Sequence, residues 1–298
     1  MKIAKGTARA TGGRQKAISR EPRKRVLIVE DDATTRHLLS AVLKGAKLSV
    51  VTAEDGVAGL RQLRKGGFDL ALLDVWMPKM NGLELLAQMR SEGLETRAVV
   101  MTSDSTPETL LRAIREQAYY FLTKPVEPKK LLELVENALA ASPVPPIEVL
   151  SARPDWVELL APCEMGTADR IQSFMTQLDV DLSTEVRESV GQVFREMLMN
   201  AIEWGGRLDP NRKVRVAYLR ARRMLLYRIA DPGPGFKIED LKHAAVGHSP
   251  DQPIEHVRVR HEKGIRPGGF GILMARALVD ELLYNEVRNE VVFVKYLD

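Results

Sequence analysis

The first half of this 298-residue chain is predicted to be a doubly wound α/β domain, and the second half a two-layer α+β domain. Two observations predict this. Between residues 25 and 141, five short apolar runs alternate with five segments of helical spacing, and the runs are continuously apolar, as parallel strands covered on both faces should be. After residue 147, long helical segments are mixed with turn-linked strand pairs, which is typical of helices packed on an antiparallel sheet.

The elements of the first half follow in a regular order. Strands are predicted over 25–29, 48–53, 70–74, 97–103 and 119–125. Helices are predicted over 33–45, 56–67, 82–93, 106–118 and 127–141, of which several end at a glycine or begin near a proline. We therefore expect a five-stranded parallel, flavodoxin-like sheet whose active site lies at the carboxyl ends of the strands.

The second half begins after a short proline-rich spacer, SPVPP, at 142–146, which is semi-rigid by composition. Strands are predicted over 147–152, 156–161, 213–221, 223–231, 282–287 and 290–297. Helices are predicted over 165–182, 183–206 and 270–282. The polar segment 237–267 holds four of the five histidines, and we expect it to form a solvated lid.

Charge is concentrated at the N-terminus. Residues 1–25 carry nine Lys/Arg against the single acid Glu21, although the formal net charge of the whole chain is only +4. A basic tail can contact nucleic acid or acidic lipid, but we favour a disordered, solubilising tail over 1–24, because it has no aromatic side chains to stack on bases. No apolar run is long enough for a membrane span, so we expect no membrane partner. Cys163 is the single cysteine, which fits a reducing cytoplasm.

Acids, hydroxyls and a lysine follow the predicted strands of the first half. Glu30 and Asp31 follow the first strand, Asp74 ends the third, and Lys124 lies at the end of the fifth. Clustered carboxylates repel one another unless a cation lies among them, and hard oxygen ligands suit Mg²⁺. The alternative is that these residues are helix caps and an isolated lysine on an unrelated flavodoxin-like domain.

The first half resembles the bacterial response-regulator receiver family over about 24–141. VLIVEDDATTR (26–36) and DVWMPKMNG (74–82) carry the resemblance, together with MTS (101–103) and FLTKP (121–125). It implies that Asp74 accepts a phosphoryl group. It also implies a Mg²⁺ site formed by Glu30, Asp31, Asp74 and the Trp76 carbonyl. The residues of the implied phosphorylation switch are Thr102, Phe121 and Lys124.

A second set of residues predicts a nucleotide site in the second half. Glu196 and Asn200 are four apart on one predicted helix and therefore share a face. Asp231 precedes a glycine-rich turn with Gly233 and Gly235. A third segment, RPGGFGILMAR (266–276), places glycines at a helix start, where exposed N–H groups bind anions, and these are Gly268, Gly269 and Gly271. Read singly, Glu196 could be a solvated acid and Asn200 a polar interface residue.

Residues 147–298 resemble the ATP-binding fold shared by gyrase, Hsp90, histidine kinases and MutL, and within it the anti-sigma-factor serine kinases. FREMLMNAIEWGG (194–206), DPGPGF (231–236), GGFG (268–271) and the hairpin NEVVFVK (289–295) carry this resemblance. It implies that Asn200 coordinates Mg²⁺, Glu196 is the base, Asp231 reads adenine and the glycines hold the phosphates. Trp204 departs from the family pattern, since relatives often have His there.

Together these resemblances imply a response regulator with an ATP-dependent serine/threonine-kinase-like output. Its partners would be an upstream histidine kinase and a downstream anti-anti-sigma or sigma-type protein, and both families often pair, which allows a homodimer. The alternative is a non-catalytic module that binds a protein, with or without ATP, under the control of phosphorylation. The sequence predicts Mg²⁺ and ATP as the cofactors.

Overall fold

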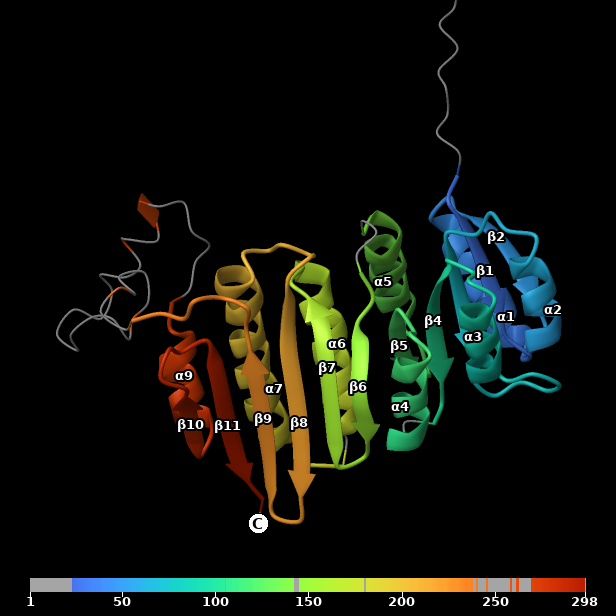
Figure 1. The fold of residues 1–298 in the computed structure, drawn as a ribbon. Helices are drawn as coiled ribbons and strands as arrows, with labels where there is room; N and C mark the ends of the chain where they lie inside the picture. Colours follow the sequence, from blue (N-terminus) through green and yellow to red (C-terminus); the bar gives the residue numbers. More distant parts are fainter. Residues whose placement is uncertain are drawn as a thin grey trace, which may run out of the picture.

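The computed structural model describes residues 23–104, 106–141, 145–179, 181–237, 240, 245, 258, 261–262 and 269–297. Nearly all of the predicted tail, most of the predicted lid and Gly268 lie outside these residues. The two halves form two separate sheets, seen on opposite sides of Figure 1. Among the described residues, no helix has the length and apolar character needed to cross a bilayer.

The first sheet has five parallel strands in the order β2-β1-β3-β4-β5. Its strands are β1 (Arg25–Val29), β2 (Ser49–Ala53), β3 (Leu70–Asp74), β4 (Arg97–Thr102) and β5 (Tyr120–Thr123). Its helices are α1 (Ala33–Gly45), α2 (Gly56–Leu63), α3 (Gly82–Ser91), α4 (Pro107–Arg115) and α5 (Pro128–Ala140). Leu39 of α1 packs with Leu131 of α5 on one face, and Leu60 of α2 packs with Leu85 of α3 on the other. The predicted doubly wound fold is therefore confirmed.

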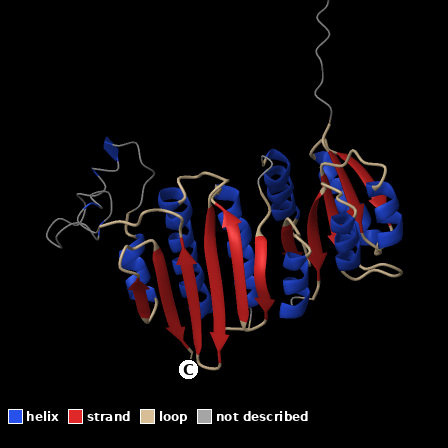
Figure 2. Ribbon diagram, in the orientation of Figure 1, coloured by secondary structure: helices blue, strands red, loops and turns tan. Residues whose placement is uncertain are grey.

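The second sheet has six antiparallel strands in the order β10-β11-β9-β8-β7-β6. These strands are β6 (Glu148–Arg153), β7 (Trp156–Pro162), β8 (Lys213–Ala221), β9 (Met224–Ala230), β10 (Glu281–Tyr284) and β11 (Glu290–Tyr296). Helices α6 (Met165–Leu178), α7 (Thr184–Asn200) and α9 (Gly271–Leu278) accompany it. Figure 2 shows α6 and α7 together on one face of the sheet, which confirms the predicted two-layer sandwich.

Two predicted helices of the second half end earlier than their apolar spacing suggests. The first ends at Leu178, because the next residue, Asp179, turns into the core and accepts hydrogen bonds from the hydroxyls of Tyr218 (2.9 Å) and Tyr227 (2.5 Å). The second changes at Asn200 into a π-helix, η1 (Ala201–Gly205), a widened turn that is common at functional sites.

The two halves contact each other through α4 and β5 of the first and α6 and β6 of the second. The guanidinium of Arg170, on α6, lies 4.4 Å from the ring centre of Tyr119 and donates from Nε to the Tyr119 carbonyl at 2.8 Å. In the opposite direction, Arg115 donates to the carbonyl of Ala152, on β6. Buried apolar residues of both halves belong to one continuous cluster, so the contact includes core as well as polar groups.

Candidate functional site

Four charged side chains meet at the carboxyl end of the first sheet. Carboxylate oxygens of Glu30, Asp31 and Asp74 lie within 4.8 Å of one another. Lys124 Nζ lies 2.8 Å from Glu30 Oε2 and 2.8 Å from Asp74 Oδ1. Glu30 and Asp74 are only 1% and 3% exposed, whereas Asp31 is open to solvent. The parallel topology therefore assembles this cluster from three strands, as the sequence predicts.

The cluster is electrostatically unfavourable for its own carboxylates. Burial raises the pKa of Asp74, and the charge of Asp31 adds to this rise, while Lys124 opposes it. Burial also raises the pKa of Glu30, with Lys124 again opposing. Two buried acids and one exposed acid share a single ammonium group, so a divalent cation fits the donor set. Its oxygens are the hard ligands that Mg²⁺ prefers.

The loop after Asp74 leaves no room for a larger residue at its far end. A Cβ at Gly82 would lie 2.1 Å from the Asp74 carbonyl oxygen. Asn81 then caps α3, because its side chain accepts from the Glu84 N–H at 2.8 Å while Glu84 bonds back to the Asn81 N–H at 3.0 Å. Between these points the Trp76 side chain is 57% exposed. The loop thus returns tightly to the strand end and holds Asp74 at the rim of the sheet.

The predicted switch residues surround this cluster without all contacting it. Thr102 ends β4, next to β3, and its hydroxyl accepts from the Asp104 N–H at 3.0 Å. Phe121 lies in β5 and is 8% exposed, packed into the core. The Lys124 ammonium group contacts Asp74 directly, and the Lys124 backbone N–H donates to the Thr102 carbonyl at 2.7 Å. The structure therefore joins Lys124 to the acids and leaves the Thr102 hydroxyl engaged with its own loop.

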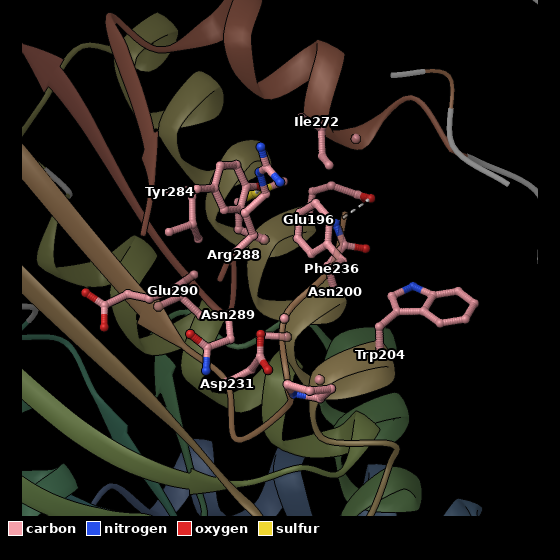
Figure 3. Close-up of a pocket in the computed structure, with 18 of the residues that line it drawn as sticks. Glu196, Asn200, Trp204, Asp231, Phe236, Ile272, Tyr284, Arg288, Asn289 and Glu290 are labelled. Carbon is pink, nitrogen blue, oxygen red and sulfur yellow. Dashed lines mark hydrogen bonds between the residues drawn. The ribbon is translucent and has the colours of Figure 1, made fainter. Parts of the chain in front are cut away.

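The second half contains a pocket of about 450 Å³ between α7, η1, the end of β9, the β10–β11 hairpin and the start of α9. Figure 3 shows how its labelled side chains are arranged. All but one of the predicted site residues that are described line this pocket, and these are Glu196, Asn200, Asp231, Gly235, Gly269 and Gly271. The exception is Gly233, whose N–H donates to the Asp231 carboxylate. Helix α7, the glycine-rich turn after Asp231 and the start of α9 thus meet at one site.

Asp231 is surrounded by glycine backbone. Its Oδ1 accepts from the Gly233 N–H at 2.7 Å. A Cβ at Gly205, the last residue of η1, would lie 2.1 Å from the Asp231 side chain. Burial raises the pKa of Asp231, and the Gly233 bond opposes the rise. The arrangement presents a half-buried carboxyl group to the pocket, next to the apolar side chains of Ile229 and Val291.

Glu196 lies across the pocket from Asp231, and Asn200 lies between them (Figure 3). Asn200 Nδ2 is 3.5 Å from Glu196 Oε1, so the predicted shared face of α7 is confirmed. A Cβ at Gly271 would lie 2.1 Å from the same Glu196 oxygen. The Glu196 carboxylate therefore packs against the first turn of α9, where the sequence predicts an anion site. Gly269, two residues earlier, has φ +101°, which favours glycine.

One wall of the pocket is not predicted by the sequence patterns, and it is formed by Phe236, Tyr284, Arg288 and Asn289. The Phe236 and Tyr284 rings meet edge to face, with centres 5.6 Å apart. Asn289 belongs to the turn of the last hairpin, and its carbonyl accepts from the Asp231 N–H at 2.8 Å. The pairing of β9 with β11, which is not local in sequence, brings this turn to the site. The sequence predicts the hairpin itself, and its turn residues Arg288 and Asn289 are the signal that could have identified this wall.

Two family models match the chain in separate ranges. The response regulator receiver domain matches residues 26–136, and the histidine kinase-like ATPase domain matches residues 163–295. The DNA-binding response regulator MtrA of Mycolicibacterium paratuberculosis is 30% identical over 204 residues, which cover 67% of this chain and 89% of MtrA. The transcriptional regulatory protein ZraR of Salmonella typhimurium is 35% identical over 115 residues, or 39% of this chain and 26% of ZraR.

Solved structures that resemble the chain include a CheY-like receiver domain protein from Methanospirillum hungatei. It has 29% sequence identity and a TM-score of 0.39, and the match covers 40% of this chain and 94% of that one. Chemotaxis protein CheY4 of Vibrio cholerae has 31% identity and a TM-score of 0.38, covering 40% of this chain and all of its own. With the family models and the relatives above, the chain belongs to the response-regulator family and joins a receiver domain to a histidine kinase-like ATPase domain.

Proposed function

We propose that this response regulator takes a phosphoryl group on Asp74 and thereby controls an ATP-dependent, serine/threonine-kinase-like output that acts on a protein partner. The receiver domain implies an upstream kinase as the donor. The observation that carries the proposal is the pair of assembled sites, a buried acid–lysine cluster in one domain and a nucleotide-sized pocket in the other. We propose the domain limits as 25–141 and 147–298, with the tail at 1–24 and the linker at 142–146.

In the receiver, the Asp74 carboxylate would attack the phosphorus of a phosphohistidine. The P–N bond of the donor breaks, an O–P bond to Asp74 forms, and the imidazole leaves. Lys124, already 2.8 Å from Asp74, would pair with the added phosphoryl oxygens. The Thr102 hydroxyl would leave the Asp104 N–H and donate to another phosphoryl oxygen. The Phe121 side chain would change its position in response. Glu30, Asp31, Asp74 and the Trp76 carbonyl would hold Mg²⁺, which neutralises charge on the transferred group.

In the output domain, Asp231 would accept from the amino group of adenine while the base packs on the surface formed by the paired residues Ile229 and Val291. Asn200 would hold Mg²⁺ through its amide oxygen. Glu196 would take the proton from a serine or threonine hydroxyl as that oxygen attacks the γ-phosphorus and ADP leaves. The glycine turns at 233–235 and 268–271 would allow close approach to the nucleotide.

A second reading is favoured by the position of Glu196. Its carboxylate packs against Gly271 and interacts with Asn200, so the side chain has a structural role in this pocket whether or not it removes a proton. The chain would then bind ATP without transferring phosphate and hold an anti-anti-sigma or sigma-type protein. The DNA-binding activity in the name of the mycobacterial relative is not part of either reading, because residues 163–295 match an ATPase domain.

The two readings are separated by one assay. The full chain is incubated with Mg²⁺, γ-labelled ATP and an anti-anti-sigma-type protein, with and without a small-molecule phosphodonor. Under the kinase reading we expect label on a serine or threonine of the partner. If ATP binds but no label is transferred to the partner, the kinase reading is wrong and the binding-only reading remains.

Control of the output would pass through the contact between the two domains. Arg170 of α6 contacts Tyr119, the residue just before β5, and its neighbour Asp169 pairs with Arg195 Nη1 of α7 at 2.6 Å. Arg195 is adjacent to Glu196, which lines the nucleotide pocket. Burial lowers the pKa of the Arg170 guanidinium, and the charge of Glu164 opposes this without forming a salt bridge among the described residues. A modest free-energy change in either domain would therefore shift the docking equilibrium of the two domains.

We expect Arg170→Ala to uncouple the domains. The variant loses a cation–π contact and a hydrogen bond, together worth about 1–3 kcal/mol, which shifts a two-state docking equilibrium about 5- to 150-fold. ATP affinity is measured with and without the phosphodonor, and the difference seen in the wild type should disappear. Arg220→Ala, which breaks a pair with Asp181 away from this contact, is the matched control. An undiminished phosphodonor effect in Arg170→Ala would show that coupling does not use this contact.

A further inference from the structure

Arg288 lies in the turn between β10 and β11 and has an uncommon backbone conformation. Its φ is +60°, in the left-handed region that a non-glycine residue enters at a cost. The turn is held by Asn285, whose carbonyl accepts from the Arg288 N–H at 3.1 Å. The Asn285 side-chain oxygen also accepts from the N–H groups of Asn289 (3.1 Å) and Glu290 (3.2 Å). The position of Arg288 is therefore fixed by its own turn.

This turn is also fastened to the glycine turn that carries Asp231. The Asn289 carbonyl accepts from the Asp231 N–H at 2.8 Å, and Asn289 Nδ2 donates to the Gly233 carbonyl at 3.0 Å. The Phe236 N–H bonds the Val287 carbonyl at 3.1 Å, the same group that a Cβ at 235 would strike. Arg288 is thus held at a set distance from the proposed adenine-reading carboxyl, which is a requirement for a ligand-binding cation.

The charge balance of the pocket lining requires a cation for an anionic ligand. Its titratable residues among the described chain include three acids, Glu196, Asp231 and Glu290, and two arginines, Arg207 and Arg288. Glu290 is already paired with Arg228 at 2.8 Å. Arg288 has no ion pair within the part of the chain that the structure describes. It is half-buried, whereas Arg207 is exposed.

Figure 3 shows the direction of the Arg288 side chain. In this view its guanidinium points toward the end of the pocket that holds Glu196, and away from Asp231. If the base of a nucleotide lies on Asp231, its phosphate chain runs past Asn200 toward the Glu196 end of the pocket, to which Arg288 points. A guanidinium offers two parallel N–H donors to one phosphate group.

We propose that Arg288 is a further binding residue of this pocket, one that contacts the phosphate chain of a nucleoside di- or triphosphate. The inference rests on the proposed nucleotide site and adds to it a specificity for ligands that carry phosphate over the bare nucleoside. Its position on the last hairpin means that the C-terminal strands supply a ligand contact as well as a sheet edge.

The test is calorimetric binding of adenosine, ADP and ATP to the full-length wild type, Arg288→Gln and Arg288→Lys in Mg²⁺. We expect Arg288→Gln to weaken ADP and ATP binding about 10- to 100-fold, the loss of one or two charge-assisted hydrogen bonds, and to change adenosine binding less than about 3-fold. Arg288→Lys keeps the charge without the fork, so it should lie between Arg288→Gln and the wild type. Arg276→Gln is the matched control, since Arg276 lies on α9 beside Tyr284 but does not line this pocket.

The outcomes are distinguishable. A wild type that binds neither adenosine nor ATP overturns the nucleotide site and this inference with it. A wild type that binds ATP, with Arg288→Gln equal to it for ATP and ADP, overturns the role of Arg288 alone. An equal loss for adenosine and ATP also overturns it, because a displaced turn would weaken every ligand. If the thermal melt shows that Arg288→Gln does not fold, the test rests on Arg288→Lys. In that case, an ATP affinity of Arg288→Lys equal to those of the wild type and of Arg276→Gln overturns the role of Arg288.

Discussion

Asp74→Asn is expected to abolish labelling of the receiver by a small-molecule phosphodonor. The amide has no anionic oxygen to attack phosphorus, so the loss should be complete rather than partial. The substitution is nearly isosteric, and it removes one of three carboxylates that crowd within 4.8 Å. Because burial raises the pKa of the Asp74 carboxyl, its neutral replacement should leave the free energy of unfolding unchanged or raise it. Labelling is followed with acetyl phosphate and Mg²⁺, and unfolding with urea.

Asp32→Asn provides the control for this prediction. Asp32 follows the cluster directly and caps α1, where its side chain accepts from the Thr35 N–H at 2.7 Å. Asparagine caps a helix about as well as aspartate, so the variant should fold and be labelled like the wild type. Label that persists in Asp74→Asn would identify another acceptor and remove Asp74 from the proposed reaction. Loss of label in both variants would indicate that the loop after β1, not the acceptor, has been disturbed.

The acid cluster could be predicted from the sequence because strand order in a doubly wound sheet has few solutions. Once Glu30 and Asp74 are placed at the ends of neighbouring parallel strands, their proximity follows from topology. The partner of the Thr102 hydroxyl could not be predicted in the same way. It depends on the loop after β4, where the Asp104 N–H donates to the Thr102 hydroxyl at 3.0 Å. The conformation of a loop leaves no periodic signal in the sequence.

The nucleotide pocket shows the same division. The face shared by Glu196 and Asn200 follows from helical spacing, but the change to a π-helix after Asn200 does not. That change depends on close backbone approach, since a Cβ at Gly205 would strike Asp231 and one at Gly206 would strike Cys163. Both partners are distant in sequence, so hydrophobic spacing predicts one unbroken helix.

The domain contact was the least accessible feature of all. Tyr119 and Arg170 belong to different domains, and in the sequence each is an ordinary residue at a strand start or on a helix. A stacked pair of this kind requires the relative placement of two folded domains. That placement is set by packing of α4 and β5 on α6 and β6, and no local pattern encodes it.

Asn200→Ala is expected to weaken binding of Mg²⁺–ATP by about 100-fold, or roughly 3 kcal/mol, because it removes a neutral oxygen ligand of the ion. The side chain lies in the pocket 3.5 Å from Glu196, so its loss also leaves that carboxylate without its amide neighbour. Adenosine, which carries no phosphate and recruits no ion, should bind nearly as well as to the wild type. The measurement is calorimetry with each ligand, with Mg²⁺ present and then removed by EDTA.

Removal of the metal makes this prediction specific to the proposed role. If Asn200 acts through Mg²⁺, the wild type and Asn200→Ala should bind ATP with similar affinity in EDTA and diverge when Mg²⁺ is restored. Asn200→Asp keeps an oxygen ligand and should recover most of the Mg²⁺-dependent affinity, whereas Asn211→Ala, in the turn before β8, should not affect binding. Equal ATP affinity of wild type and Asn200→Ala in Mg²⁺ would place the metal elsewhere. A loss of the same size for adenosine would instead mean that Asn200 holds α7 in shape, and that the pocket wall rather than a metal ligand had been removed.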